Sequence, residues 1–218
     1  MLSFKQWGIR AIALALLLFS LLLPACGKED PSDNETTAPV ADTSPHGVSY
    51  YDNMEDLSSF LTLGSYKGLT VTPKEGQTKE DAVWEAVIAN ATRVAVPTEE
   101  VDYYFASLCA QYRYYASLKD MEYSELLSSL GISEASLRSD AYQMVRKDLL
   151  FVAVLRDSKI SLTDTEKNSL FPKYVDKFVS DYGYSADDVT TDLRELIYET
   201  MLYDKVTEYL LANNTVTD

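Results

Sequence analysis

The apolar stretch at residues 149–155 is the feature that most constrains the fold. Its sequence, LLFVAVL, is apolar at every position, so a helix formed by it would be apolar on all sides. Seven residues are too few to cross a membrane, because a spanning helix needs about 20. We therefore expect this stretch to be the centre of a helix that other helices enclose, and to form the main core.

A long amphipathic helix is predicted after Pro97, with Thr98 as its N-cap and acidic residues in the first turn. Its apolar residues recur at steps of three and four and therefore share one face. They are Val101, Tyr104, Phe105, Leu108, Tyr112 and Tyr115. Tyrosines at this spacing usually pack between helices, but some could line a cleft, where the ring holds apolar segments and the hydroxyl stays in water.

Start and stop signals predict further helices. The sequences TKED at 78–81 and TDTE at 163–166 are capping boxes. Gly131 should end a short helix, Ser133 should begin a second long one, and Pro172 should kink or restart the helix that contains it. Extended segments are short, as in the alternation of Leu69 and Val71 with threonines. With no strand-rich section long enough for a barrel or sandwich, the predicted class is mostly α.

The N-terminus has the parts of a secretory signal: Lys5 and Arg10, an apolar run at 11–23, and a small residue before Cys26. The sequence LPAC at 23–26 resembles the lipobox of bacterial lipoproteins. The resemblance implies removal of residues 1–25 and a diacylglyceryl group on Cys26, whose two chains would anchor the protein stably. The alternatives are a plain signal peptide with a chance cysteine, or an uncleaved anchor.

The following segment, 26–47, is polar and rich in proline, so it is predicted to be a flexible tether. His46, the single histidine, lies at its end without other ligands at metal-binding spacing, and we predict an ordinary tether residue. If Cys26 carries lipid, Cys109 is left without a partner for an intramolecular disulfide. The fold must then be held together by packing.

The acidic balance of the chain restricts its partners. The 218 residues contain 34 Asp and Glu against 19 Lys and Arg, for a net charge of -15. This excludes nucleic acid and electrostatic adhesion to anionic lipid as expected functions, so any link to the membrane would be the lipid. A single histidine excludes histidine-based catalytic triads, and neither a GxGxxG nor a P-loop motif is present. We expect no catalytic residues, no metal and no cofactor.

Four segments resemble trigger-factor-type chaperones, in particular their C-terminal helical domain. They are LGSYKGLTV at 63–71, VWEAVIANAT at 83–92, VPTEEVDYY at 96–104 and LYDKVTEYLLANNTVT at 202–217. In that family an FKBP-type prolyl isomerase domain follows the segment that 66–73 resembles. Here only residues 75–81 separate that segment from the next helix, and a domain needs on the order of a hundred residues. The isomerase domain is therefore absent.

The resemblance implies an extended linker at 48–78 and a helical arm-and-cradle domain at 79–218. The expected function is a chaperone of the holdase type, lipid-anchored on the outer face of the cytoplasmic membrane, that binds unfolded exported polypeptides. The expected peptide contacts are Tyr104, Phe105, Leu108, Tyr112 and Tyr115, with Tyr174 and Phe178 opposite. Two alternatives remain: a folding factor related to peptidyl-prolyl isomerases, and a structural lipoprotein that docks one partner.

Overall fold

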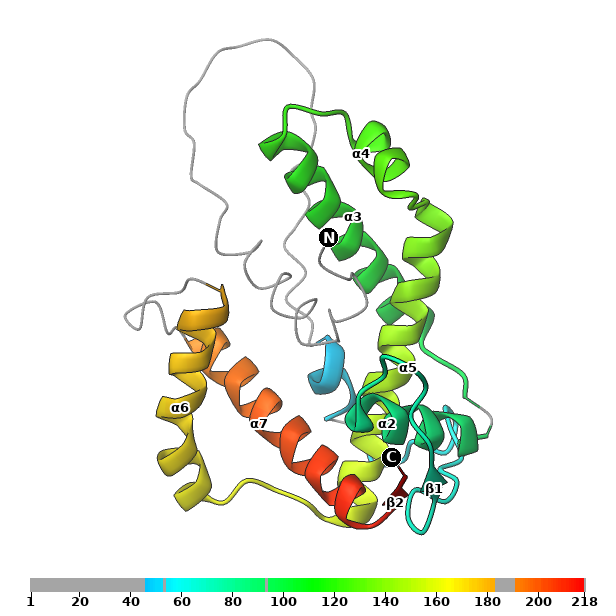
Figure 1. The fold of residues 1–218 in the computed structure, drawn as a ribbon, viewed down its shortest axis with the longest axis vertical. Helices are drawn as coiled ribbons and strands as arrows, with labels where there is room; N and C mark the ends of the chain where they lie inside the picture. The colour runs from blue at the N-terminus through cyan, green and yellow to red at the C-terminus, as the bar shows by residue number, and fades with distance from the viewer. Residues whose placement is uncertain (1–45, 53, 93, 183–190, 218) are drawn as a thin grey trace.

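A computed structural model describes residues 46–52, 54–92, 94–182 and 191–217, and within them the chain is mostly helical (Figure 1). The prediction of a mostly α fold is confirmed. The six α-helices of the described residues are α2 (Lys79–Asn90), α3 (Thr98–Leu118), α4 (Tyr123–Leu130), α5 (Glu134–Ser158), α6 (Asp164–Tyr182) and α7 (Thr191–Ala212). A 3-10 turn, η2 (Gly47–Tyr51), precedes them, and β1 (Thr70–Val71) and β2 (Thr215–Val216) are two-residue strands.

Helix α5 is the central element, and its apolar second half lies in the main core. Leu149, Leu150 and Val154 are fully buried, so the prediction for this stretch is confirmed. The partners come from the whole chain: Tyr51 and Leu61 before α2, Val83 and Val87 on α2, and Val206 and Leu210 on α7. Burial of an apolar side chain stabilises a fold by about 1.5–3 kcal/mol, so this cluster joins the two ends of the described chain to its centre.

Two helical arms extend from this body in different directions (Figure 1). One consists of α3, α4 and the first half of α5, held by Val101, Leu108 and Val145 and, farther out, by Leu127 and Leu137. The other is the α6–α7 hairpin, which has its own apolar cluster of Phe178, Leu193, Leu196, Ile197 and Met201. Since α5 and α7 each run from an arm into the body, the arms are extensions of the core helices.

A parallel strand pair ties the C-terminus to the segment before α2. Thr70 pairs with Thr215 and Val71 with Val216. Asn214 reinforces the pairing, because its Oδ1 accepts from the backbone N–H of Leu69 at 2.8 Å. Sequence analysis predicted the extended segment around β1, but it placed no strand at residues 215–216.

Most of the predicted helix signals agree with the structure. Thr163 and Glu166 form the reciprocal bonds of a capping box, and Gly131 ends α4 with a left-handed φ of 67°, which glycine adopts without strain. The predicted N-cap Thr98 is wrong by one residue, since Pro97 occupies that position and Thr98 is already helical. Helix α6 continues through Pro172 and does not restart there.

Candidate binding cleft between the helical arms

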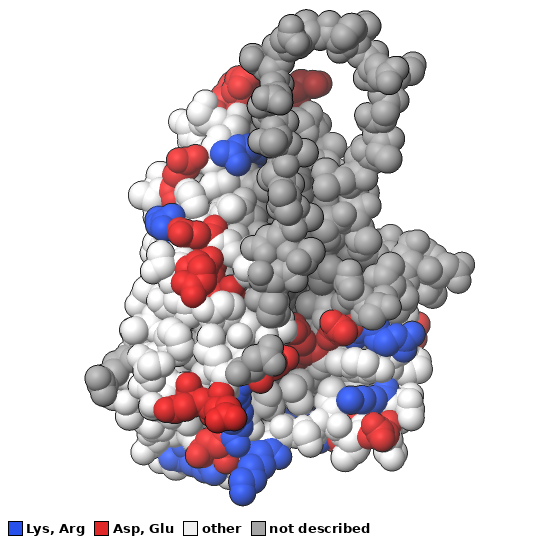
Figure 2. Space-filling model, turned by 180° about the vertical axis from the view of Figure 1, so that it is seen from behind, with Lys and Arg blue, Asp and Glu red and all other residues white. Residues whose placement is uncertain are grey.

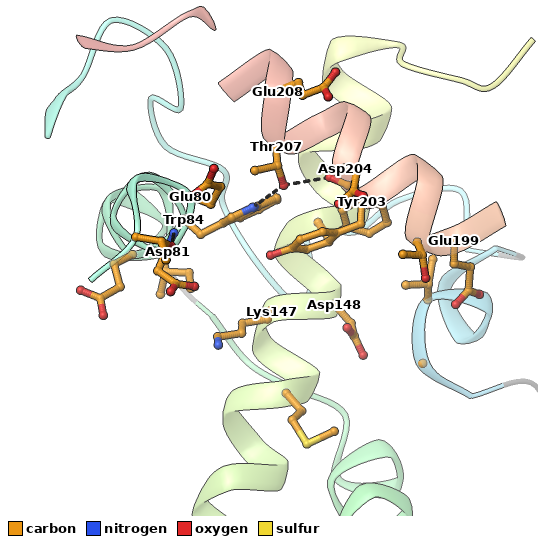
Figure 3. Close-up of a pocket in the computed structure, with 18 of the residues that line it drawn as sticks. Glu80, Asp81, Trp84, Lys147, Asp148, Glu199, Tyr203, Asp204, Thr207 and Glu208 are labelled. Atoms are coloured by element: carbon orange, nitrogen blue, oxygen red, sulfur yellow. Dashed lines mark hydrogen bonds between the residues drawn. The ribbon is translucent and has the colours of Figure 1, made fainter. Parts of the chain in front are cut away.

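A cleft of about 1300 Å³ lies where the two arms meet the body. Its walls come from α2, α5, α6 and α7, from Tyr103 and Tyr104 on α3, and from residues 46–48. Figure 3 shows α2 and α7 facing each other across α5. Helices distant in sequence therefore contribute to one concave surface, which is the usual form of a binding site.

One part of the cleft, here called the aromatic end, is formed by Trp84, Phe151 and Tyr203. The Trp84 and Tyr203 rings stack with centroids 5.3 Å apart and an interplanar angle of 15°, and Phe151 lies 5.6 Å from Tyr203. The indole Nε1–H of Trp84 donates to Oγ1 of Thr207 at 2.9 Å. Trp84 and Phe151 are buried, whereas Tyr203 is half-buried, so the rings are fixed by packing and leave one face of the group to the cleft.

The opposite part, here called the carboxylate end, is formed by Asp148 on α5 and Glu199 on α7. Asp148 is 7% exposed, and its Oδ2 accepts from the Tyr104 hydroxyl at 2.5 Å. Burial raises the pKa of Asp148 to about 7, the hydrogen bond from Tyr104 opposes this shift, and the charge of Glu100 adds to it. Burial also raises the pKa of Glu199 to about 7, with a further contribution from Asp148. Both carboxyl groups are therefore poised to change charge near neutral pH.

Glu100 on α3 holds the segment that enters the body beside this end. Its side chain is fully buried, Oε2 accepts from the backbone N–H of Gly47 at 2.8 Å, and Oε1 lies 2.6 Å from Nδ1 of His46. The imidazole stacks on Tyr103 with centroids 3.6 Å apart. The prediction that His46 is an ordinary tether residue is therefore wrong. Glu100 was predicted only to complement the dipole of its helix, but its side chain also holds His46 in place.

Charged side chains surround the cleft, and acidic ones predominate. Nine carboxylates and four lysines contribute to its lining. Lys74 pairs with Glu85 at 2.7 Å, and Lys147 extends toward α2, away from Asp148 (Figure 3). Figure 2 shows, from behind, several separate groups of acidic side chains and fewer basic ones on a surface that is otherwise mostly uncharged. In the described part of the chain, no group of three His, Cys, Asp or Glu residues has the arrangement of a metal site.

The structure brings only some of the predicted contact residues to the cleft. Tyr104 and Tyr174 line it, and the Tyr174 hydroxyl donates to Oδ2 of Asp204 at 2.8 Å. The other five do not line it. Phe105, Leu108 and Tyr112 pack within the α3–α4–α5 arm, Tyr115 contacts Tyr112 and Gln111 there, and Phe178 is buried between α6 and α7.

Four residues that define the two ends of the cleft were not predicted from the sequence: Trp84, Tyr203, Asp148 and Glu199. Trp84 and Tyr203 lie in two of the segments that resemble trigger-factor-type chaperones, but nothing in those segments marks either residue as part of a cleft. Asp148 did carry a signal, because a carboxylate directly before the all-apolar stretch at 149–155 must enter the same enclosed region. Glu199 had none, since glutamate on a helix is usually solvated.

Fold and cleft together define a two-armed helical protein with an open cleft lined by aromatic and acidic residues. No protein-family model, curated protein or solved structure matches this chain. Among the described helices, none combines the length and apolar character that a membrane crossing requires. The proposed lipid site Cys26 and the segment at 26–45 lie outside the described residues. So does the sequence SADD at 185–188, which predicts a further helix start.

Proposed function

We propose that this protein is a folding chaperone of the holdase type, which binds unfolded segments of exported polypeptides in the cleft between its arms. The observation that carries the proposal is the cleft itself, about 1300 Å³ in volume and lined by aromatic rings from five helices, α2, α3, α5, α6 and α7. Tyr103, Tyr174 and Tyr203 are only half-buried there, whereas a single compact bundle would bury its rings fully. An open surface of this size accommodates an extended segment of several residues.

The chemistry of the cleft suits weak and varied ligands. The aromatic end offers flat rings that contact apolar side chains of different shapes, and each well-buried side chain of a client would contribute about 1.5–3 kcal/mol. Ordering a flexible chain opposes much of that gain. The exposed charges around the rim, such as Glu80, Glu208 and Lys173, keep the empty cleft hydrated and limit self-association. We therefore expect transient, reversible binding.

A lipid anchor on Cys26 would compensate for weak affinity. Because Glu100 holds His46 and Gly47, the tether would be residues 26–45, which as a flexible coil would span on the order of 25 Å. It would hold the cleft close to the outer face of the cytoplasmic membrane, where exported chains emerge. Confinement of this kind raises the effective concentration of a binder without any new contact.

Aggregation of a reduced model substrate tests the function. We expect the soluble chain from Gly27 onward to slow light scattering by the substrate, and Tyr174→Ala to reduce this protection because it removes a ring from the cleft. Tyr142→Ala is the matched control, since Tyr142 is 37% exposed on α5 and does not line the cleft. Absence of protection at several-fold molar excess would refute the proposal. Capture of one stoichiometric partner would instead support a docking lipoprotein.

A further inference from the structure

The carboxylate end of the cleft suggests a more specific ligand than an apolar segment. We propose that Asp148 and Glu199 form a subsite for a cationic side chain, lysine or arginine, of the bound polypeptide. The inference rests on the proposed function, because it assumes that a polypeptide enters the cleft. It specifies which polypeptide segments the cleft would select, namely those with basic residues next to apolar or aromatic ones.

The two carboxylates face the same space from different helices. Figure 3 shows Asp148 on α5 and Glu199 on α7 on the side of α5 that lies toward η2. Asp148 has one hydrogen bond, from Tyr104, although a carboxylate can accept about four. Among the described residues, neither Asp148 nor Glu199 has an ion-pair partner, and Glu199 has no hydrogen bond. The acceptor capacity of both groups is therefore largely unused.

The Tyr51 hydroxyl is a further polar group near the carboxylates, and it supports the inference independently of them. Tyr51 is fully buried, and no group of the described residues hydrogen-bonds its hydroxyl. Burial raises the pKa of Tyr51, and Asp148 and Glu100 raise it further, so this hydroxyl faces the same carboxylates. Buried polar groups without a partner are rare because they are costly. An ammonium or guanidinium group at Asp148 could donate to the Tyr51 oxygen as well.

No cation of the described chain occupies this position. Lys147, the nearest in sequence, extends toward α2 (Figure 3), while Lys173 and Lys177 on α6 are exposed. Charged and titratable groups face the pair from each packed element: Lys147 on α5, Glu195 on α7, Glu100 and Tyr104 on α3, and Tyr51 and Asp52 at η2. Most of them are acidic or neutral, so the local field favours a positive ligand.

Charge also excludes the two occupants that the chain itself could supply. Residues 26–45 contain five acidic residues and one lysine, and a second copy carries the same net charge of -15. Either one would bring negative charge to the carboxylates, which is unfavourable. The occupant that complements the site is a basic segment of another polypeptide.

Binding of a cation to this subsite is coupled to the loss of protons. A positive charge stabilises the ionised forms of Asp148 and Glu199 and lowers both pKa values. Since these values are raised to about 7 in the empty cleft, binding near neutral pH releases protons. Affinity for a basic segment therefore increases as the pH rises from about 6 to about 8, while lysine itself stays charged over that range.

Fluorescence anisotropy with two labelled peptides tests this inference. The peptides share length and aromatic content, and one carries lysine where the other carries glutamate. We expect the lysine peptide to bind more tightly at pH 8 than at pH 6, and Glu199→Gln to weaken it roughly tenfold and flatten the pH dependence. Glu199→Gln should preserve the fold, because the side chain forms no hydrogen bond to any residue that the structure describes. Glu125→Gln is the control, since Glu125 is exposed on α4 and outside the cleft.

Equal affinity for the two peptides, or unchanged affinity in Glu199→Gln, would overturn the subsite. If the protein still suppressed aggregation in that case, the proposed function would stand without the charge preference. If it bound neither peptide and gave no protection, both proposals would fail. The two measurements thus separate the general function from the specific ligand.

Discussion

The two ends of the cleft differ in how completely their polar groups are satisfied. At the aromatic end the Trp84 indole has its acceptor, Thr207, whose own hydroxyl donates to the backbone oxygen of Tyr203 at 2.8 Å. At the carboxylate end Asp148 has one hydrogen bond, and the Tyr51 hydroxyl has none within the described residues. Within the described part of the chain, the polar groups of the first arrangement are paired, whereas those of the second are paired only in part.

This difference in hydrogen bonding indicates that one end of the cleft stabilises the fold and the other recognises a ligand. Apolar and fully paired groups lower the free energy of the folded state. A buried carboxylate with few partners raises that free energy whenever it ionises. The aromatic end therefore holds the body together and offers a general surface, whereas the carboxylate end costs stability and supplies specificity. Substitutions at the two ends should have opposite effects on the free energy of unfolding.

The largest effect is expected at the aromatic end, from Trp84→Ala. Trp84 is 7% exposed and packs between Phe151 and Tyr203, so its truncation leaves a large cavity. We expect a loss of about 3–5 kcal/mol in the free energy of unfolding, measured by urea denaturation with circular dichroism. Trp84→Phe, which keeps an aromatic ring, should cost distinctly less. A loss below about 1 kcal/mol for Trp84→Ala would show that this end does not support the core.

At the carboxylate end, Asp148→Asn should stabilise the protein at high pH. Burial raises the pKa of Asp148 from 3.8 to about 7. The favourable contribution of Asp148 to the free energy of unfolding is therefore fully present below about pH 4 and is lost as the pH rises to about 7. Asparagine keeps an oxygen for the Tyr104 hydroxyl and does not ionise. We expect a gain on the order of 2–4 kcal/mol at pH 8 and little change at pH 4.

Urea denaturation of both proteins at pH 4, 6 and 8 measures this difference. Glu208→Gln is the control, because Glu208 lies on the same cleft but is exposed, and it should not change the slope of stability against pH. Parallel pH profiles for the wild type and Asp148→Asn would mean that Asp148 ionises in the folded protein without cost.

The aromatic end and the core were more accessible to sequence reasoning than the carboxylate end. The all-apolar stretch at 149–155 predicted its own burial, and the caps at Thr163 and Ser133 predicted helix starts, because these signals are local. Periodicity also placed six residues of α3 on one face. It could not distinguish the part of that face that packs on α5 from the part near Tyr104 that reaches the cleft, since only the positions of α5 and η2 decide this.

The features that sequence could not predict depend on distant contacts. The pairing of β1 with β2 joins residues 145 positions apart. A two-residue strand has no periodicity to reveal it. Likewise, Glu199 has the same sequence context as the exposed Glu195 and Glu208 on its helix. Its raised pKa arises from burial and from Asp148, which only the packing of α7 against α5 creates.

The smallest expected effect comes from the hydroxyl of Tyr51. Because this group is buried without a hydrogen bond from the described residues, Tyr51→Phe should raise the free energy of unfolding by about 0.5–1 kcal/mol. Tyr50→Phe is the matched control, since the Tyr50 hydroxyl donates to Oε1 of Glu99 at 2.5 Å, and it should be neutral or slightly destabilising. Urea denaturation followed by Trp84 fluorescence resolves differences of this size.

A ligand should reverse the sign of the Tyr51 effect. If a bound lysine or arginine uses the Tyr51 oxygen, Tyr51→Phe gains stability in the empty protein but loses affinity for the basic peptide, whereas Tyr50→Phe changes neither by much. At the carboxylate end alone, a single substitution would then increase stability and decrease affinity for the peptide. A destabilised Tyr51→Phe with unchanged peptide affinity would instead show that the hydroxyl already has a partner within the folded protein, and that the two ends of the cleft are equally complete.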